Sequence, residues 1–374
     1  MKVAVVGLGG VGSAAAYHLA RDGHAVVGIE QFRVDHDRGE SFGGSRMIRR
    51  IYADPFYTRL MDVAYRLWDS FQAEAGEELF VRCGGIFFGL PDDPELHAFE
   101  TATTEAGVPF ERWDAAEAGR RYPQFRFQPG EVALYQADTG FLRASRCVRA
   151  AARLARERGA QLREETRLLA IESAADGVHL HLADGEILVA DRAVVCAGPW
   201  TGRLLADRGV RVPLVVTRQQ YLHLLPREGD TQFAIGRFPL WYHAGGHGMY
   251  GFPEEESVPG VKIADHHLGP RVDPDQVDRE VDDACREAIR AYARARLPDL
   301  TDRISYEKVC LYDNTPNEDF IIDRLPDDPR VVVIGGTSGH GFKFVTLLGR
   351  IAAELAADRE PSCDLHRFAL ARFR

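Results

Sequence analysis

The chain has 374 residues, with 56 acidic and 46 basic side chains and a formal net charge of −10 at pH 7. This length allows two domains with substantial cores, and the absence of a long Lys/Arg block argues against a general nucleic-acid binder. The chain starts directly in a strand-like segment and holds no apolar stretch of membrane-spanning length, so we expect a cytoplasmic protein without membrane partners. Its six widely spaced cysteines predict reduced thiols.

The N-terminal segment predicts a β-strand, a glycine turn and a helix over residues 13–22. Gly7, Gly9 and Gly12 have the spacing G-x-G-x-x-G, and the next strand ends on Glu30. This context is typical of a dinucleotide-binding unit, because glycines let the backbone approach a pyrophosphate at the helix N-terminus. Glu30 is placed to accept hydrogen bonds from a ribose diol, which disfavours a 2′-phosphate. The alternative is a glycine-rich turn without a ligand.

The middle of the chain alternates helical and strand-like patterns. Apolar periodicity predicts helices over residues 56–76 and 143–158, and two Asp-Gly pairs, at 176–177 and 184–185, predict hairpins. From about residue 212, successive aromatic-rich runs are typical of a mostly antiparallel sheet.

An amphipathic helix is predicted after this sheet, with Asp273 as its N-cap and Pro274 as its first residue. The final segment then returns to a nucleotide-binding pattern, with a buried strand, a glycine-rich turn and a helix over residues 344–357. We therefore expect an α/β protein whose nucleotide-binding domain is discontinuous and interrupted by a sheet domain.

Five segments of the chain, in this order and spacing, resemble the monomeric sarcosine oxidase family, which includes N-methyltryptophan oxidase. They are GLGGVGSAAAYHLA, GESFGGSRMIRRIY, YGFPEEESVPGVKIADHH, CLYDNTPNEDFIID and GGTSGHGFKF. The family belongs to the flavoproteins of glycine oxidase and D-amino-acid oxidase type. The resemblance implies a Rossmann-like FAD-binding domain with an inserted, mostly antiparallel substrate domain. Our predicted boundaries are 1–80, 140–211 and 318–374 for the FAD-binding domain, and 81–139 and 212–317 for the substrate domain.

The resemblance also implies how FAD is held. Cys310 matches a cysteine that holds the flavin through a thioether, whereas an isolated cysteine is more often a buried free thiol. Arg46 would lie against the flavin, and Phe42 stands where the family often has a histidine, which removes a polar flavin contact. The further residues expected at the cofactor are Gly39, Ser41, Gly339, His340, Gly341 and Lys343. A structural histidine is an equal interpretation of His340.

The same resemblance assigns catalytic positions. Arg49 and Lys343 would bind the substrate carboxylate, which a planar guanidinium can meet with two parallel hydrogen bonds. Lys262 would lie above the reactive edge of the flavin and assist oxygen reduction, although a lone lysine in an apolar strand is usually an edge charge. The expected pocket wall consists of Tyr250, His266 and Tyr312, and its size depends also on Trp241 and Tyr242.

The implied function is an FAD-dependent oxidase of amino acids with a secondary amine, such as N-methyl or cyclic imino acids. A hydride passes to flavin N5, the product is an imine, and oxygen is reduced to hydrogen peroxide. We expect a monomer that needs no metal and has only the small substrate and oxygen as partners. Three alternatives stay open: a flavin dehydrogenase that passes electrons to a protein or quinone, an NAD-dependent dehydrogenase, and a non-catalytic nucleotide-binding protein.

Overall fold

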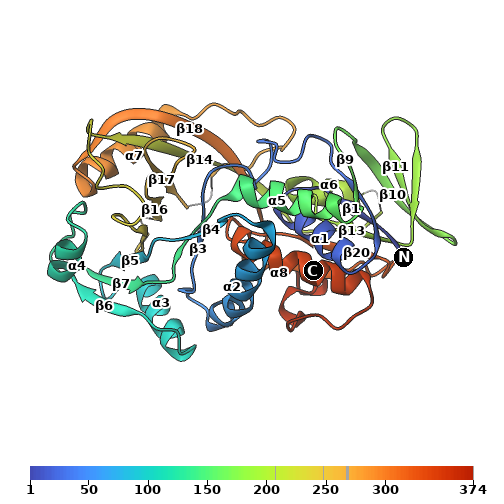
Figure 1. Ribbon diagram of the computed structural model, residues 1–374, viewed down its shortest axis with the longest axis horizontal. Coiled ribbons are helices and arrows are strands. Elements are labelled where there is room, and N and C mark those ends of the chain that lie inside the picture. Colours follow the sequence, from blue (N-terminus) through green and yellow to red (C-terminus); the bar gives the residue numbers. More distant parts are fainter. Residues whose placement is uncertain (207, 247, 267–268, 374) are drawn as a thin grey trace.

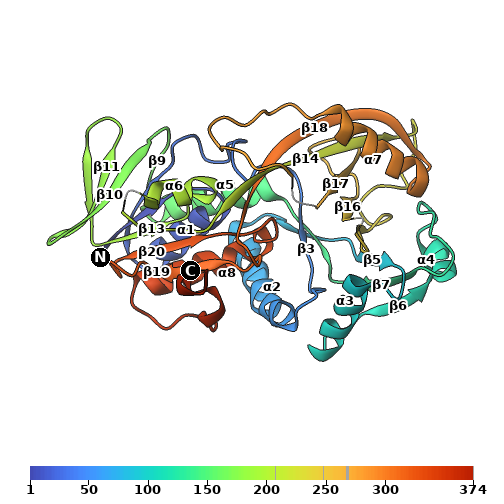
Figure 2. The same ribbon diagram turned by 180° about the vertical axis from the view of Figure 1, so that it is seen from behind.

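The computed structural model describes residues 1–206, 208–246, 248–266 and 269–373. Figures 1 and 2 show an elongated molecule in which both termini lie in one lobe, beside strands β1, β13 and β20. The second lobe is built around a larger sheet, and β14 and β18 run side by side from this lobe towards the first. The expected α/β fold, with a nucleotide-binding sheet and a mostly antiparallel second sheet, is confirmed.

A six-stranded sheet with the order β19-β20-β13-β1-β2-β9 forms the core of the first lobe. It is parallel except for β19, which pairs antiparallel with β20. Its strands are β1 (Lys2–Val6), β2 (Ala25–Ile29), β9 (Gln161–Arg163), β13 (Arg192–Val195), β19 (Ile321–Arg324) and β20 (Val331–Gly335). The four central strands are short buried runs of Val, Ala and Ile, as expected for a sheet that is covered on both faces.

Helices cover one face of this sheet and a small antiparallel sheet covers the other. The helices are α1 (Gly10–Arg21), α2 (Pro55–Ala75), α5 (Ala144–Glu157) and α8 (Val345–Ala356), and α1 contacts both α5 and α8. The small sheet consists of β10 (Leu168–Ala174), β11 (Gly177–Leu182) and β12 (Ile187–Ala190), followed by α6 (Thr201–Ala206). Apolar residues of the small sheet share one core with β1, β2 and β13. Both predicted Asp-Gly hairpins are present here.

The larger sheet has the strand order β18-β14-β17-β16-β15-β5-β7-β6 and is antiparallel except where β15 meets β5. Its strands are β5 (Gly85–Gly89), β6 (Glu111–Asp114), β7 (Val132–Gln136), β14 (Val215–Pro226), β15 (Leu240–His243), β16 (Met249–Phe252), β17 (Val261–Asp265) and β18 (Leu300–Asn314). The accompanying helices are α3 (Pro94–Glu105), α4 (Ala115–Arg121) and α7 (Asp283–Arg296). This sheet places Lys262 on β17 opposite His223 and Cys310 on β18 opposite Gln219, four residues apart along the intervening β14.

A three-stranded sheet connects the two lobes. It consists of β3 (Arg46–Ile48), β8 (Gly140–Leu142) and β4 (Phe80–Arg82), in the order β3-β8-β4. Arg46 begins β3 and Arg49 directly follows it, so the arginine segment lies between the two large sheets. The assignment of chain segments to two domains stays a prediction.

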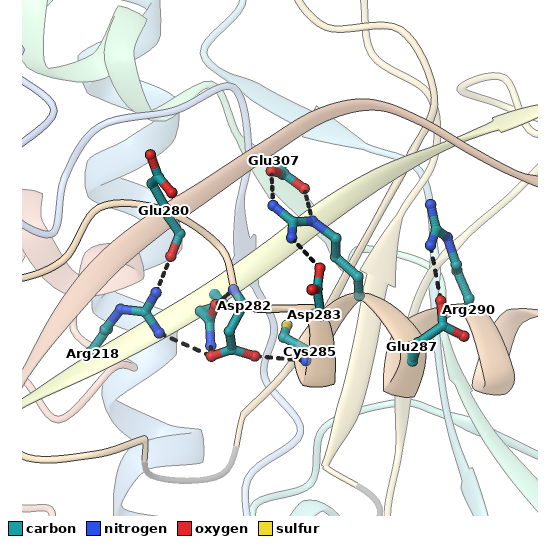
Figure 3. A network of polar contacts seen from close by, with 10 residues as sticks. Arg218, Glu280, Asp282, Asp283, Cys285, Glu287, Arg290 and Glu307 are labelled. Atoms are coloured by element: carbon teal, nitrogen blue, oxygen red, sulfur yellow. Dashed lines mark hydrogen bonds and ion pairs between the residues drawn. The ribbon is translucent and has the colours of Figure 1, made fainter.

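The predicted start of helix α7 is wrong. The helix begins at Asp283, and its N-cap is Asp282, whose carboxylate accepts a hydrogen bond from the Cys285 N–H at 2.8 Å. Arg218 of β14 explains the difference, because its guanidinium binds the carbonyl oxygens of residues 278 and 280. These bonds hold residues 278–280 in the loop that precedes the helix. Figure 3 shows Arg218 between Glu280 and Asp282, at the point where the loop gives way to the helix.

Within the described part of the chain, we find no helix that is both long and apolar enough to cross a bilayer.

Candidate active site

A cavity of about 420 Å³ lies between the two large sheets and receives residues from both. It brings together most of the predicted site residues, although they come from widely separated segments. Those that line it are Gly7, Gly9, Glu30, Gly39, Ser41, Arg46, Arg49, Tyr250, Lys262, His266, Cys310, Tyr312, Gly339, His340, Gly341 and Lys343. Gly12 and Phe42 do not belong to this lining.

The glycine turn at one end of the cavity has the geometry of a phosphate-binding turn. Gly7 has a φ of +85°, which favours glycine, and Gly9 is the N-cap of α1. A Cβ on Gly12 would lie only 1.8 Å from the carbonyl oxygen of Gly7, so this glycine allows α1 to pack closely against the turn. Two of the three glycines therefore line the cavity, while Gly12 holds the helix in position behind them. The helix N-terminus favours an anionic ligand there.

Glu30 is fixed at the edge of this end of the cavity. Its Oε2 accepts a hydrogen bond from the Leu8 N–H at 2.8 Å, and its Oε1 accepts one from the Phe32 N–H at 3.0 Å. The side chain is 4% exposed. A carboxylate held in this way keeps further acceptor sites for the hydroxyls of a ribose.

The 39–46 segment continues the cavity wall towards the second lobe. The Ser41 Oγ accepts a hydrogen bond from the Gly10 N–H at 2.9 Å, which ties this segment to the start of α1. Arg46 donates to the backbone carbonyls of Glu40 at 2.8 Å and Phe42 at 2.6 Å. The Phe42 ring faces Lys308 at 5.5 Å. Phe42 thus supports the wall through its backbone.

Cys310 lies in the cavity wall beside two cations. Burial raises the pKa of its thiol, and the positive charges of Arg46 and Lys262 oppose this rise. Since the thiolate is the nucleophilic form, these cations favour reactivity at this position. Of the six cysteines, Cys310 alone lines the cavity and has cations near it on both β3 and β17. Cys196 also lines the cavity, but burial raises the pKa of its thiol to about 12.

Arg49 is enclosed by aromatic rings. The centroids of the rings of Tyr52, Phe87, Phe99 and Tyr242 lie 5.0 to 5.3 Å from its guanidinium carbon. The residue is 9% exposed, and its Nε and Nη1 atoms meet no hydrogen-bond acceptor among the residues that the structure describes. A buried guanidinium with free donors is costly unless an anion reaches it, so its position suits a carboxylate ligand.

Lys343 brings a second cation to this end of the cavity. It lies in a short 3-10 turn over residues 342–344, and its Nζ donates a hydrogen bond to the His340 carbonyl at 2.9 Å. Burial, followed by the positive charge of Arg49, holds its pKa well below the usual range. Each positive charge therefore raises the free-energy cost of burying the other, and a carboxylate placed between them would lower the cost for both.

Lys262 is a buried cation. It is 4% exposed, its Nζ donates to the Ser45 carbonyl at 3.0 Å, and it lies over the ring of Tyr221 at 4.3 Å. Burial and the charge of Arg46 lower its pKa well below the usual range. The interpretation of this lysine as an exposed edge charge is therefore excluded, and its ammonium group is available to an anion that forms in the cavity.

The remaining wall is formed by tyrosine and histidine side chains. The hydroxyl of Tyr312 lies 3.2 Å from Nδ1 of His266, and burial raises the pKa of Tyr250 to about 12, so both tyrosines are neutral near pH 7. Tyr242 also lines the cavity, whereas Trp241 is fully buried and stacks on Tyr292 outside it. His267, the last residue of one family segment, lies outside the described residues.

His340 uses both ring nitrogens within the protein. Its Nε2 lies 3.0 Å from the Glu318 carbonyl, and its Nδ1 lies 3.3 Å from the Tyr52 hydroxyl. Burial and the charge of Lys343 hold its pKa well below the ordinary value, so the ring is neutral. This bonding fits the structural interpretation of His340, although the residue also lines the cavity.

Sequence reasoning missed several residues of this cavity. Glu40 and Asp313 line it directly after Gly39 and Tyr312, which had been singled out, and Thr337 lines it two residues before Gly339. Three of the four aromatic residues around Arg49 come from α3, β5 and β15 and carry no local pattern that relates them to an arginine.

Comparison with known proteins is consistent with this geometry. Residues 2–355 match the model of a family described as FAD dependent oxidoreductase. The chain belongs to this family. It is 38% identical to the monomeric sarcosine oxidase of Streptomyces avermitilis, over 95% of this chain and 93% of that protein. It is 32% identical to the N-methyl-L-tryptophan oxidase of Escherichia coli strain K12 / DH10B, over 99% of this chain and 98% of that protein.

Solved structures give the same relationship. The open form of the Tyr258Phe mutant of NikD, an unusual amino acid oxidase essential for nikkomycin biosynthesis, superposes with a TM-score of 0.88 at 25% identity, over 98% of this chain and 96% of that chain. The L-proline dehydrogenase from P. horikoshii has the same fold, with a TM-score of 0.86 at 23% identity, over 100% of this chain and 97% of that chain. The expected membership of the sarcosine oxidase and N-methyltryptophan oxidase family, and with it the class of FAD-dependent amine oxidase, is confirmed.

Proposed function

We propose that this flavoprotein oxidises amino acids that carry a secondary amine, such as N-methyl or cyclic imino acids, with oxygen as the electron acceptor and hydrogen peroxide as a product. One observation carries the proposal: two buried cations, Arg49 and Lys343, meet in the cavity without a carboxylate partner within the part of the chain that the structure describes. A substrate carboxylate would supply the missing charge. The relatives named sarcosine oxidase and N-methyltryptophan oxidase support this choice of substrate class.

The residues of the cavity fit FAD. The turn at Gly7 and Gly9 would hold the pyrophosphate, and Glu30 would accept hydrogen bonds from the adenosine ribose. When bound, FAD would supply the redox chemistry, which is the acceptance of a hydride from the carbon next to the amine and the transfer of the electrons to oxygen. We also propose that the Cys310 thiol holds the flavin covalently.

Arg49 and Lys343 would then orient the substrate. The unpartnered Nε and Nη1 lie on opposite sides of the guanidinium, and either one can donate together with Nη2 two parallel hydrogen bonds to one carboxylate, while the aromatic surroundings exclude water and strengthen the ion pair. With its carboxylate fixed, the substrate has one end anchored, and its amine must face the wall of Tyr250, His266 and Tyr312. None of these three residues is an anion near pH 7, so the wall does not favour a protonated amine. We therefore expect the neutral amine to react.

Lys262 would act in the second half of the reaction. Its ammonium group lies in the cavity and is fixed by the Ser45 carbonyl and the ring of Tyr221. A fixed cation lowers the free energy of forming an anion such as superoxide, because no solvent has to reorganise. The monomeric state and the cytoplasmic location stay predictions.

The test is a screen for hydrogen peroxide under air with sarcosine, N-methyltryptophan, proline and pipecolate. We expect at least one of these to be oxidised, with stoichiometric peroxide and bleaching of the flavin in the absence of oxygen. Flavin bleaching with dye reduction but without peroxide would instead support the dehydrogenase alternative. Bound flavin that none of these compounds bleaches would reject the proposed substrate class.

A further inference from the structure

Two acidic residues, Glu40 and Asp313, line the same cavity and share one hydroxyl group between them. The Thr337 Oγ lies 3.2 Å from Glu40 Oε2 and 3.0 Å from Asp313 Oδ1. A hydroxyl has a single hydrogen, so it can donate fully to only one of these oxygens. It must therefore share its hydrogen between both oxygens or accept a proton from one of the carboxyl groups. Two carboxyl groups gathered around one hydroxyl repel each other when both are ionised, so the geometry favours a state in which one of them is protonated.

Asp313 is the member of the pair that stays ionised. Besides the hydroxyl, it accepts hydrogen bonds from the backbone N–H groups of Gly336 at 2.8 Å and Thr337 at 2.7 Å. Bonds of this kind favour the charged form of a carboxyl group. Glu40 has no comparable donors: its Oε1 is buried and has no hydrogen-bond partner within the described residues. The proton therefore belongs mainly to Glu40, and the Thr337 hydroxyl, which lies within hydrogen-bond distance of both acids, connects them.

The charged groups around Glu40 agree with this assignment. Burial and the negative charge of Asp313 on β18 raise the pKa of Glu40 well above its ordinary value, and Arg46 on β3 opposes the rise only in part. Arg46 is committed to the backbone carbonyls of Glu40 and Phe42, so its donors do not reach the Glu40 carboxylate. Glu40 also influences the thiol of Cys310, another residue of β18.

Glu40 lies where a negative charge would disturb a dinucleotide. The next residue, Ser41, binds the first turn of α1 through Gly10, at the turn where the phosphates would bind. We infer that Glu40 is a cofactor-binding residue that acts as a neutral acid, and that the proton it shares with Asp313 through Thr337 keeps this part of the cavity from repelling the phosphates of FAD. This inference rests on the proposed use of FAD in the cavity.

Cofactor affinity should then depend on pH in a defined direction. When the proton is lost, the pair carries two negative charges instead of one beside the dianionic pyrophosphate, so binding weakens. Above the pH at which the free protein loses this proton, the Kd for FAD should rise by up to about tenfold per pH unit, because binding is linked to the uptake of one proton. Below that pH the Kd should not depend on the pair.

The experiment measures FAD binding by flavin fluorescence, in a Cys310→Ala background so that binding is reversible, from about pH 6 to pH 9.5, the range in which one linked proton changes the Kd. In Glu40→Gln the side chain keeps its shape, can donate a hydrogen bond and has no proton to lose. We expect its Kd to lack the rise seen in the parent protein. Lys262 and Lys343 also line the cavity and have lowered pKa values, so the difference between the two proteins at each pH is the quantity to compare.

A second variant tests the role of the hydroxyl. Thr337→Val keeps both acids but removes the hydroxyl that lowers the pKa of each, so the rise in Kd should persist and move to higher pH. A Kd of the parent protein that does not change with pH, or a rise of equal size in Glu40→Gln, would overturn the inference while leaving the proposed oxidase intact. If no variant binds FAD, both the inference and the proposed function are wrong.

Discussion

Replacing Arg49 tests the part of the site on which the proposed function depends. In Arg49→Ala the guanidinium is lost from its aromatic surroundings, where Nε and Nη1 are the donors without an internal partner. The substrate carboxylate would then rely on Lys343, which already donates one hydrogen bond to the His340 carbonyl. We expect the substrate to bind weakly, while the flavin stays in place because Arg49 is not needed to hold the glycine turn.

The expected size of the effect follows from the two donors. A hydrogen bond to a charged group contributes about 1.5–3 kcal/mol, so two such bonds amount to about 3–6 kcal/mol. Water can enter the space left by the side chain and Lys343 remains, so the lower end applies. A loss of about 3 kcal/mol corresponds to a decrease in kcat/KM of about 100-fold, since about 1.4 kcal/mol is a factor of ten. Arg49→Lys, which keeps the charge with one bond fewer, should lose about tenfold by the same reasoning.

The assay is anaerobic stopped-flow reduction of the flavin over a range of substrate concentrations, which separates substrate affinity from the rate of hydride transfer. Arg50→Ala is the matched control: Arg50 is the next residue, but it pairs with Asp62 at 3.2 Å and Asp138 at 3.4 Å and does not line the cavity. A methyl ester of the substrate provides a second control, because the parent protein and Arg49→Ala should oxidise it equally slowly. An unchanged KM for the free acid in Arg49→Ala would refute the carboxylate role.

Three further predictions follow from the same site. Lys262→Met should leave flavin reduction nearly unchanged and slow reoxidation by about 10²–10³-fold, the usual effect of removing one electrostatic stabiliser. Reoxidation in the parent protein should also decline as pH rises through the lowered pKa of this lysine, because only the ammonium form is a cation. Stopped-flow mixing with oxygen would show neither effect if Lys262 takes no part in the oxygen reaction. Acid denaturation should leave the yellow colour on the parent polypeptide but release it from Cys310→Ala. Cys285→Ala, in which a cysteine of α7 is replaced, is the control and should keep the colour. Free flavin from the parent protein would contradict the covalent link. Gly12→Ala should lower the free energy of unfolding by about 1–3 kcal/mol and reduce FAD content, because its Cβ would overlap the Gly7 carbonyl, whereas Gly119→Ala in α4, where a Cβ meets only Phe127 at 4.0 Å, should be tolerated in thermal unfolding.

The features that could be predicted from the sequence are those whose cause is local. The glycine turn, the hairpins at the Asp-Gly pairs and the helices with a long apolar periodicity depend on neighbouring residues, and each is present. The start of α7 was missed because its cause is distant. Arg218 on β14 donates hydrogen bonds to the carbonyls of residues 278 and 280 in the preceding loop, and the sequence near Asp273 does not indicate these contacts.

The candidate site shows the same division. Family segments identified the cations that line the cavity, but not what surrounds them. The aromatic residues that enclose Arg49 come from different elements, and the Glu40–Thr337–Asp313 chain joins three segments that are remote in sequence. Such contacts depend on the packing of the two large sheets around the arginine segment. A spacing pattern along one sequence carries no information about them.

The distribution of charge within the cavity connects the two proposals. At the end lined by the glycine turn, the acidic groups have partners within the protein: backbone N–H groups bind Glu30 and Asp313, Arg149 pairs with Asp35, and Glu40 would carry a proton. At the other end, Arg49 and Lys343 have no carboxylate beside them in the described structure. The first end is thus prepared to accept a ligand that brings its own negative charges, and the second end requires one. A dinucleotide bound at the first end would therefore leave the buried cations available to a substrate carboxylate, and the amine of that substrate would face the wall of Tyr250, His266 and Tyr312.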